Sequence, residues 1–543
     1  MHIHRYPRRY ITDKGVIAVP PQPVPLLDLL GALEPLLVTT RHVYNVPIAG
    51  LAFDSRRVAR GDLFVAVTGF RQDGHAFIAQ ALERGAAALV TEREVPVADV
   101  PVIRVRNARR ALAALACRFF AHPSAHLNVI GITGTNGKTT AAAMLRSILA
   151  FSGNGCGLIG TVDVVTGRRR LPARLTTPEA PEIQAYLNEM RDAGLSHAVM
   201  EVSAQGVELE RVTGTRFVLG GVTNVSTDHL DFYPSLGAYA RTKGRFLAMV
   251  SPDRPVLVNA DNDLSLALAR AYHPENVVTY AVDGPADVSA GRTALGRHGA
   301  SFQLTIHRAL PRPGGGSCGP LRLNVRIPLL GKQNVYNALL AATAALVLDA
   351  PPYAVVRALR TFRGVARRMQ VYRAGPLTVV DDTALNPASI DAVMATIRSV
   401  FGSQRLTAVY AVRGGRGPEI NRRNALVFAS WLARFPGSRL IATSSAGEVG
   451  AGDVVSPEEE EAFHATLRRH GISCPHYSDL RAALAAALDI TRGEGILVLL
   501  GAQGMDNGSR VLFELLAGRE RAGAPEIAFP APVPSAARQH ILA

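Results

Sequence analysis

One stretch near residue 130 constrains the fold more than any other part of the chain. Residues 127–140 read LNVIGITGTNGKTT, an apolar run rich in β-branched residues that breaks into a glycine-rich loop, and an alanine-rich helical pattern begins at Ala141. β-branched runs favour strands, and a strand joined to a helix by a short loop is the repeating unit of parallel α/β sheets. The stretch therefore predicts a strand, a loop and a helix within an α/β domain.

The loop has the composition of a phosphate-binding loop. Its glycines allow backbone N–H groups to approach a polyphosphate, Lys138 adds a positive charge, and the following helix presents the positive end of its dipole. Thr139 is then placed to offer its hydroxyl to Mg²⁺. The spacing is G-x-x-G-K-T from Gly134, because Ile132 occupies the position five before Gly137. A glycine-rich turn that binds nothing is the alternative, but the flanking strand and helix favour a nucleoside triphosphate.

Length and composition indicate several globular domains. The chain has 543 residues, of which 48% are hydrophobic and 19% charged, so it can form more than one apolar core. The formal net charge of +15 comes mainly from scattered arginines, which favours attraction of anionic small molecules over nucleic-acid binding. The four cysteines lie far apart with no C-x-x-C pair, which argues against a zinc or disulfide framework.

The sequence contains no pattern typical of a membrane-spanning helix or of a signal peptide. No apolar run approaches the roughly 18 residues of a spanning helix, and residues 1–20 lack the apolar segment of a signal peptide. We therefore expect a cytoplasmic protein without membrane insertion. We expect it to act on small-molecule substrates, as a monomer or weak oligomer.

Three domains are expected along the chain. In the first, 1–123, residues 64–67 read as a buried strand and 75–86 as an amphipathic helix that Gly85 ends. A polar break precedes the second, 124–364, where strands and helices alternate as in a mostly parallel sheet. After Gly364 the alternation restarts in the third, 365–543, which we expect to be a smaller doubly wound unit.

Three further residues of the second domain are candidates for chemistry. Glu201 ends the apolar run HAVME, and a carboxylate at the end of a strand in an α/β sheet is well placed to bind Mg²⁺, although a surface carboxylate is the alternative. His229 follows the next strand; alone it would be a structural hydrogen-bonding residue, but with Glu201 and Thr139 it becomes a candidate metal ligand. Lys243, by its spacing alone, reads as a solvated surface lysine.

Six short motifs occur in an order that resembles the Mur ligase family. They are GTNGKTT from 134, LTTP from 175, MEVSAQG from 200, TNVSTDHLDF from 223, AYARTKGRF from 238 and GKQNVYN from 331. The segment DSRRVARGDLFVAVTGFRQDGH from Asp54 is similar to the nucleotide-sugar-binding domain of MurE-type members. The resemblance is specific over about 50–370 and extends more loosely to about 515. It implies an α/β fold of three domains, with a central P-loop sheet and a C-terminal Rossmann-like domain.

The resemblance also implies a reaction. Family members use ATP to activate a peptide carboxylate as an acyl phosphate, which an amine then attacks. It implies an ADP-forming ligase of peptidoglycan synthesis that adds an amino acid to UDP-N-acetylmuramyl-dipeptide. Thr139 and Glu201 would bind one Mg²⁺ and His229 a second. Lys243 matches the family's carbamylated lysine, in which CO₂ converts an ammonium into a carboxylate-like anion that can position Mg²⁺.

The remaining site residues implied by the resemblance form four groups. The ATP phosphates would contact Gly134, Thr135, Asn136, Gly137, Lys138, Thr139 and Thr140. The adenosine end would contact Asn334, Arg368 and Asp382, although Asn334 also reads as a helix cap and Arg368 as a surface cation. The uridine diphosphate part of the acid substrate would contact Ser55, Phe70, Arg71 and Gln72. Its sugar-peptide part would contact Thr176, Thr177, Ser203 and Arg211.

The third domain departs from the family where the amine would be selected. The family's D-Y-A-H-[TN]-P segment here has Leu385 in place of histidine, and its G-K-G-H-E segment is represented by residues 502–506. The D-N-P-R motif, in which arginine binds the carboxylate of diaminopimelate, is replaced by ATSSAGEVG. The reaction therefore stays open between addition of an amino acid to UDP-N-acetylmuramyl-dipeptide, as in MurE-type members, and the joining of a different acid and amine by a paralogue in a specialised pathway. A non-catalytic ATP-binding homologue is the third alternative.

Overall fold

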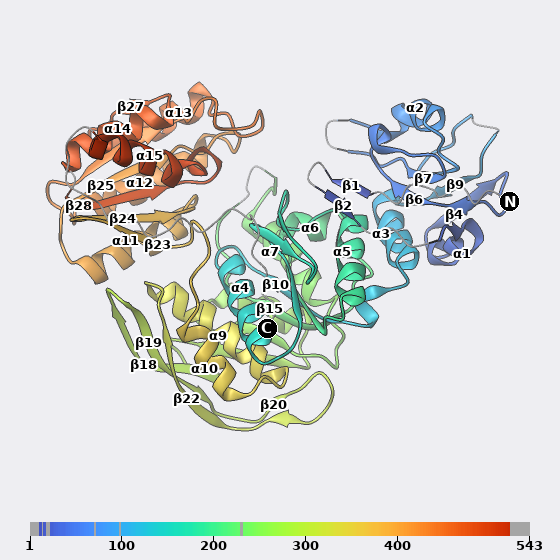
Figure 1. Cartoon of the computed structure of the whole chain (residues 1–543), viewed down its shortest axis with the longest axis horizontal. Helices are drawn as coiled ribbons and strands as arrows, with labels where there is room; N and C mark the ends of the chain where they lie inside the picture. Colours follow the sequence, from blue (N-terminus) through green and yellow to red (C-terminus); the bar gives the residue numbers. More distant parts are fainter. Residues whose placement is uncertain are drawn as a thin grey trace.

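Three β-sheets organise the chain into three bodies (Figure 1). The structure is a computed structural model that describes residues 10–12, 15–17, 22–69, 72–96, 99–228, 232–492 and 494–521. Within these ranges no helix has both the length and the apolar character needed to cross a membrane.

The N-terminal sheet has five strands in the order β4-β9-β8-β7-β6, and β4 alone is antiparallel to its neighbour. Its predicted helix begins with a 3₁₀ turn, Gly74–Phe77, and Gly85 follows it with φ +91°. The strands are β4 (Leu37–Arg41), β6 (Gly50–Ala52), β7 (Asp62–Val65), β8 (Ala88–Thr91) and β9 (Val102–Val105), with the separate pairs β1 (Tyr10–Thr12) with β2 (Gly15–Ile17) and β3 (Val24–Pro25) with β5 (Pro47–Ile48). The helices are α1 (Leu26–Leu30), α2 (Ile78–Glu83) and α3 (Ala108–Phe119).

The central sheet has eleven strands in the order β13-β12-β11-β14-β10-β15-β16-β17-β18-β19-β22. The seven strands from β11 to β18 in this order run parallel, and the strands beyond them at both ends are antiparallel. The strands are β10 (Asn128–Thr133), β11 (Cys156–Ile159), β12 (Asp163–Val165), β13 (Arg170–Pro172), β14 (His197–Glu201), β15 (Phe217–Val222), β16 (Val256–Asn259), β17 (Val277–Ala281), β18 (Val288–Gly296), β19 (Gly299–Ile306) and β22 (Leu321–Ile327), and a hairpin of β20 (Leu310–Pro311) and β21 (Ser317–Cys318) lies outside the sheet. The helices are α4 (Lys138–Phe151), α5 (Ala180–Asp192), α6 (Ala204–Glu208), α7 (Leu236–Leu247), α8 (Asp263–Tyr272), α9 (Lys332–Val347) and α10 (Pro352–Arg360).

The C-terminal sheet has six strands in the order β23-β24-β28-β25-β26-β27, and only β23 is antiparallel. The strands are β23 (Gln370–Ala374), β24 (Leu377–Asp382), β25 (Leu406–Ala411), β26 (Arg439–Thr443), β27 (His476–Tyr477) and β28 (Gly495–Leu500). The helices are α11 (Pro387–Phe401), α12 (Pro418–Leu432), α13 (Pro457–Arg469), α14 (Leu480–Thr491) and α15 (Gly508–Arg521).

Strand β10 lies in the middle of the central sheet and contributes to two cores. Its side chains alternate between the faces, so Val129 packs with residues of α5 and α7, whereas Ile130 and Ile132 pack with α4 and α9. Gly131 allows α7 to approach closely, because a Cβ there would lie 2.5 Å from the ring of Phe246. The absence of a side chain at this position therefore sets the distance of α7 from the sheet.

Candidate active site

The loop between β10 and α4 adopts a conformation that only glycines fit. Gly134 and Gly137 have φ +143° and +91°, and an added Cβ would lie 1.9 Å from Thr223 Oγ1 and 2.4 Å from Asn337 Oδ1 respectively. Lys138 is the first residue of α4, and its Nζ donates to two carbonyls of the loop, Gly134 O and Thr135 O, both at 2.9 Å. The predicted strand, loop and helix are therefore present, with the lysine turned toward the loop.

Glu201 lies beside the loop as expected from its position at the end of β14. Its carboxylate accepts hydrogen bonds from Thr139 Oγ1 at 2.8 Å, Thr161 N at 2.7 Å and Thr161 Oγ1 at 2.9 Å. Gly160 leaves room for this carboxylate, because a Cβ there would lie 2.6 Å from Glu201 Oε1. A buried carboxylate next to a threonine hydroxyl is an oxygen donor set of the kind that Mg²⁺ prefers.

Lys243 is buried and reaches the same loop from α7. Only 1% of its surface is exposed, its Nζ donates to Gly134 O at 2.8 Å, and it lies 4.4 Å from the centre of the Tyr239 ring. Burial lowers the pKa of this amine well below its ordinary value, and the charge of Lys138 lowers it further. The reading of Lys243 as a solvated surface lysine is therefore wrong, because helix periodicity alone does not show which face α7 turns to the sheet.

A polar network joins the loop to the C-terminal sheet. The side-chain amides of Asn136 and Asn386 exchange hydrogen bonds of 3.3 and 3.2 Å, and Asn386 also donates to Asp228 at 3.1 Å. Asp228 forms a buried ion pair with Arg413, whose Nη1 lies 2.9 Å from Asp228 Oδ1. The central and C-terminal sheets are thus connected directly at the phosphate loop.

The segment entering the C-terminal sheet is held by carboxylates of β24. Asp382 accepts a hydrogen bond from Met369 N at 2.7 Å, and Arg368 donates to Thr383. Arg367, which sequence reasoning missed, donates to Asp381 at 3.2 Å and also pairs with Asp506. Burial raises the pKa of Asp382 to about 6 and lowers that of Arg368, while the attraction between the two opposes both changes.

Other residues expected in the site lie elsewhere or are used locally. Asn334 is buried in the first turn of α9, where its amide donates to Leu330 O at 2.8 Å and accepts from Asn337. Ser55 lies in the N-terminal body and donates to Gln80 at 2.6 Å, and Gln72 is exposed there. Phe70, Arg71 and His229 lie outside the described residues.

The four residues assigned to the sugar-peptide part belong to one hydrogen-bond network beside Glu201. Thr177 accepts from Ser203 N and donates to Glu201 O, each at 2.9 Å, and Thr176 accepts from Thr161 at 3.1 Å. Arg211 donates to Thr177 O at 3.1 Å and pairs with Glu179 at 2.8 Å. These contacts connect Glu201 through Thr177 and Arg211 to Glu179.

Two pockets lie where the central body meets its neighbours, and no residue of the phosphate loop lines either of them. The N-terminal pocket, of about 250 Å³, lies between the first two bodies and is lined by Phe53, Asp54, Arg57, Val164, Leu171, Pro172, Ala173, Arg174, Leu175, Pro178, Glu179, Glu182 and Tyr186. The C-terminal pocket, of about 310 Å³, lies where the second and third bodies meet and is lined by Thr227, Asp228, Arg413, Gly415, Arg416, Gly417, Pro418, Glu419, Ile420 and Arg423.

The arginines of the C-terminal pocket are another feature that sequence reasoning missed. Arg413 and Arg416 follow β25 in a glycine-rich segment. The D-N-P-R motif would instead place a carboxylate-binding arginine after β26. Glu459 of α13 fixes this segment by accepting from the backbone N–H groups of 415, 416 and 417 at 3.0, 2.7 and 2.6 Å. The sequence feature that could have pointed to these arginines is the glycine-rich stretch that follows a buried strand.

Comparison with known proteins agrees with this geometry. Three family models match in order: Mur ligase family, catalytic domain, over 47–120, Mur ligase middle domain over 132–345, and Mur ligase, glutamate ligase domain, over 367–504. The UDP-N-acetylmuramyl-tripeptide synthetase of Roseiflexus sp. (strain RS-1) is 36% identical over 477 residues, which cover 84% of this chain and 90% of that protein. A UDP-N-acetylmuramoyl-L-alanyl-D-glutamate–2,6-diaminopimelate ligase of Halalkalibacterium halodurans is 30% identical over 482 residues, covering 88% and 93%.

Solved structures share the fold. MurF from Acinetobacter baumannii superposes with a TM-score of 0.66 at 21% identity, covering 91% of this chain and 100% of that one. A UDP-N-acetylmuramoyl-L-alanyl-D-glutamate–2,6-diaminopimelate ligase superposes with a TM-score of 0.58 at 24% identity, covering 87% and 96%.

The fold and the site together define an ATP-dependent, ADP-forming ligase. The chain belongs to the Mur ligase family. Its α/β fold and three-domain architecture are those predicted from the sequence.

Proposed function

We propose that the chain uses ATP to activate the carboxylate of a UDP-muramyl-dipeptide and joins it to an amino acid. The observation that carries this proposal is the position of the phosphate loop. Lys138, Glu201 and Lys243 meet there, and the central body that holds them borders one pocket at the N-terminal body and another at the C-terminal body. The relatives named above supply the substrate class, since their names specify muramyl-peptide ligases.

Thr139 and Glu201 are the residues that we propose for Mg²⁺. Their oxygens are already 2.8 Å apart, and Glu201 lies at the carboxyl end of β14. When bound, the ion neutralises charge on the transferring phosphoryl group. The chain itself supplies the loop N–H groups and Lys138, which fix the phosphates and keep the reacting oxygens aligned. His229 stays a prediction for a second ion, as do Asn334, Arg368 and Asp382 for the adenosine end.

Lys243 is proposed to carry a carbamate. Its amine lies in a buried position where it bonds a carbonyl, Gly134 O, rather than a carboxylate. An ammonium there is both desolvated and close to Lys138, whereas a carbamate would be attracted to that lysine. The bond would form between Nζ and the carbon of CO₂, with one proton released to solvent.

The N-terminal pocket is proposed for the acid substrate. Arg57 and Arg174 line it and supply positive charge for a diphosphate, and Glu179 connects it to Arg211 and the Thr177 network beside Glu201. A substrate seated there would extend its free carboxylate toward Glu201 and the phosphate loop. The contacts assigned to Ser55, Phe70, Arg71 and Gln72 stay predictions.

The C-terminal pocket is proposed for the acceptor. It contains Arg413, Arg416 and Arg423 together with Glu419, so it can bind both a carboxylate and an amino group. Arg413 pairs with Asp228, and Arg416 pairs with Asp453 at 3.2 Å. The Arg416 side chain is the more exposed of the two, at 26% against 8%, and its backbone N–H is held by Glu459, so we propose Arg416 as the ligand that would exchange Asp453 for the acceptor carboxylate. This arrangement replaces the D-N-P-R arginine of diaminopimelate-adding members.

Phosphate release from ATP tests the proposal. Release should require both UDP-N-acetylmuramyl-dipeptide and one amino acid from a panel containing diaminopimelate, lysine, ornithine and smaller amino acids. If no amino acid stimulates phosphate release, the proposal fails. If release requires a different acid, the chain is instead a paralogue that joins another acid and amine.

Arg416→Ala should raise the KM for the acceptor at least tenfold while leaving the KM for ATP unchanged. Arg439→Ala, a change at an exposed position of β26, is the matched control.

A further inference from the structure

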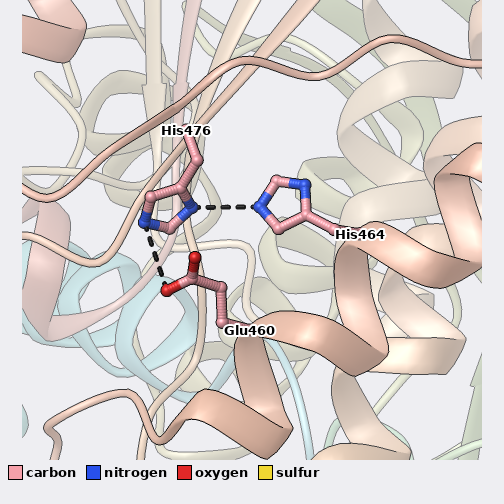
Figure 2. Close-up of side chains that lie close together, drawn as sticks. All are labelled: Glu460, His464 and His476. Atoms are coloured by element: carbon pink, nitrogen blue, oxygen red, sulfur yellow. Dashed lines mark hydrogen bonds and ion pairs between the residues drawn. The ribbon is translucent and has the colours of Figure 1, made fainter.

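Two histidines and a glutamate meet on the C-terminal body, outside the site described above. Glu460 and His464 lie one turn apart on α13, and His476 lies on β27, the edge strand of the sheet. Figure 2 shows one nitrogen of His476 facing His464, with a carboxylate oxygen of Glu460 directed toward the other nitrogen of His476. Taking one ligand atom from each residue, the three atoms lie within 4.8 Å of one another.

The nitrogen pair has the separation of two ligands of one ion. His464 Nε2 lies 3.0 Å from His476 Nδ1. Two nitrogens bound tetrahedrally to zinc, each at about 2.0–2.1 Å, lie roughly 3.4 Å apart. These nitrogens are hydrogen-bonded to each other, so an ion would replace the shared proton as the two rings turn to point at it. Glu460 Oε2 lies at the other nitrogen of His476, so its side chain would rotate toward Nδ1 to become the third ligand.

The surroundings suit neutral imidazoles with an outer hydrogen-bond partner. Both histidines are half-buried. His476 Nε2 lies 3.2 Å from Ser444 Oγ and 3.4 Å from Glu460 Oε2. With Nδ1 on a metal, the Nε2–H of His476 would donate to Ser444, which is how ligating histidines are usually oriented.

We propose that Glu460, His464 and His476 bind a divalent transition metal ion of the zinc class, through one carboxylate oxygen, His464 Nε2 and His476 Nδ1. Two imidazoles and a carboxylate favour Zn²⁺, Co²⁺ or Ni²⁺ over Mg²⁺, which prefers oxygen ligands only. The site is thus distinct in chemistry from the Mg²⁺ site proposed at Glu201.

The ion would fasten α13 to the edge strand β27. Glu460 directly follows Glu459, whose carboxylate orders the segment 415–417 that lines the C-terminal pocket. Fixing α13 therefore stabilises the helix that shapes this pocket, although the ion itself touches neither the pocket nor the phosphate loop.

Metal binding by the untagged full chain tests the proposal. Calorimetric titration with Zn²⁺ in buffer containing excess Mg²⁺ should show one site that is lost in His464→Ala and weakened at least tenfold in Glu460→Gln. Titration with Co²⁺ should give visible absorption bands of low-symmetry coordination in the wild type but not in His464→Ala. Zn²⁺ should also raise the thermal midpoint of the wild type but not of the variant.

His470→Ala is the matched control. His470 lies next to the end of the same helix and is exposed, and its ring Nδ1 hydrogen-bonds to the backbone carbonyl of Thr466 at 2.9 Å. The His470→Ala variant should bind Zn²⁺ as the wild type does. Equal stoichiometry and affinity in the wild type and in His464→Ala would overturn the proposal. If His464→Ala does not fold, as judged by circular dichroism, Glu460→Gln with unchanged Zn²⁺ affinity would overturn it equally.

Discussion

Lys138 Nζ and Lys243 Nζ donate to the same acceptor, the carbonyl oxygen of Gly134, at 2.9 and 2.8 Å. Two ammonium groups that share one carbonyl repel each other, and burial lowers the pKa of both amines. The neutral amine is the form that reacts with CO₂. A carbamate on Lys243 would turn the repulsion from Lys138 into attraction, so the pair is suited to this modification.

Lys243→Ala should lower turnover at least a hundredfold without weakening ATP binding comparably, because the loop and Lys138 stay in place. Formate or acetate should restore part of the activity by supplying the missing carboxylate. Steady-state kinetics with and without these acids measure the effect. Arg241→Ala, on the exposed side of the same helix, is the control and should keep its turnover. Full activity of Lys243→Ala would refute the carbamate role.

The ion pair between Asp228 and Arg413 predicts a coupling between domain docking and catalysis. Arg413→Met should leave a buried carboxylate without its cation, a change that costs about 3–5 kcal/mol in other proteins. Part of this cost should appear as separation of the central and C-terminal bodies, with a larger radius of gyration by small-angle scattering and a lower kcat. Asp228→Asn combined with Arg413→Met should recover compactness. An unchanged radius in the single variant would contradict this role.

Asp382 predicts a specific pH dependence of stability. Burial raises its pKa to about 6, whereas the ordinary value is 3.8. The folded protein therefore holds this proton more tightly than the unfolded chain, so the free energy of unfolding falls as pH rises from about 4 to 6 and levels off above that. The contribution is at most roughly 3 kcal/mol.

Asp382→Asn should remove this contribution, since an amide does not ionise and can still accept from Met369 N. Denaturant titrations of the wild type and the variant at pH 4.5 and 7.5 measure it. The variant should gain stability relative to the wild type at the higher pH only. Asp62, whose pKa burial also raises to about 6, stays in both proteins and cancels in the comparison. If the difference in the free energy of unfolding between the wild type and the variant is the same at both pH values, the raised pKa of Asp382 is wrong.

Gly131→Ala tests whether the contact of β10 with α7 positions Lys243. The new methyl group would lie 2.5 Å from Phe246 and 2.9 Å from Phe217, which should cost about 1–3 kcal/mol and displace α7. Activity should fall together with the thermal midpoint, and Phe246→Leu should relieve both. Gly518→Ala, in α15 where the added Cβ meets nothing within 4 Å, should leave both unchanged or raise stability slightly.

The sequence by itself determined the local units of this protein. The β-branched run, the glycines and Lys138 predicted the strand, the loop and the helix, because these preferences act within a few residues. The ordered motifs identified the family, and with it the three-domain fold and the role expected for Lys243. Glu201 lies beside Thr139 because the carboxyl ends of neighbouring parallel strands meet at one edge of a sheet.

Only the tertiary structure decided which distant segments meet. The pairing of Asp228 with Arg413 joins residues 185 apart in sequence, and His464 reaches His476 only because α13 packs beside the edge strand. Helix periodicity could not show that Lys243 is buried, since burial depends on which face α7 packs against the sheet, where Gly131 leaves room for Phe246. Such contacts depend on how sheets and helices pack around shared cores, and no local pattern in the chain encodes that packing by itself.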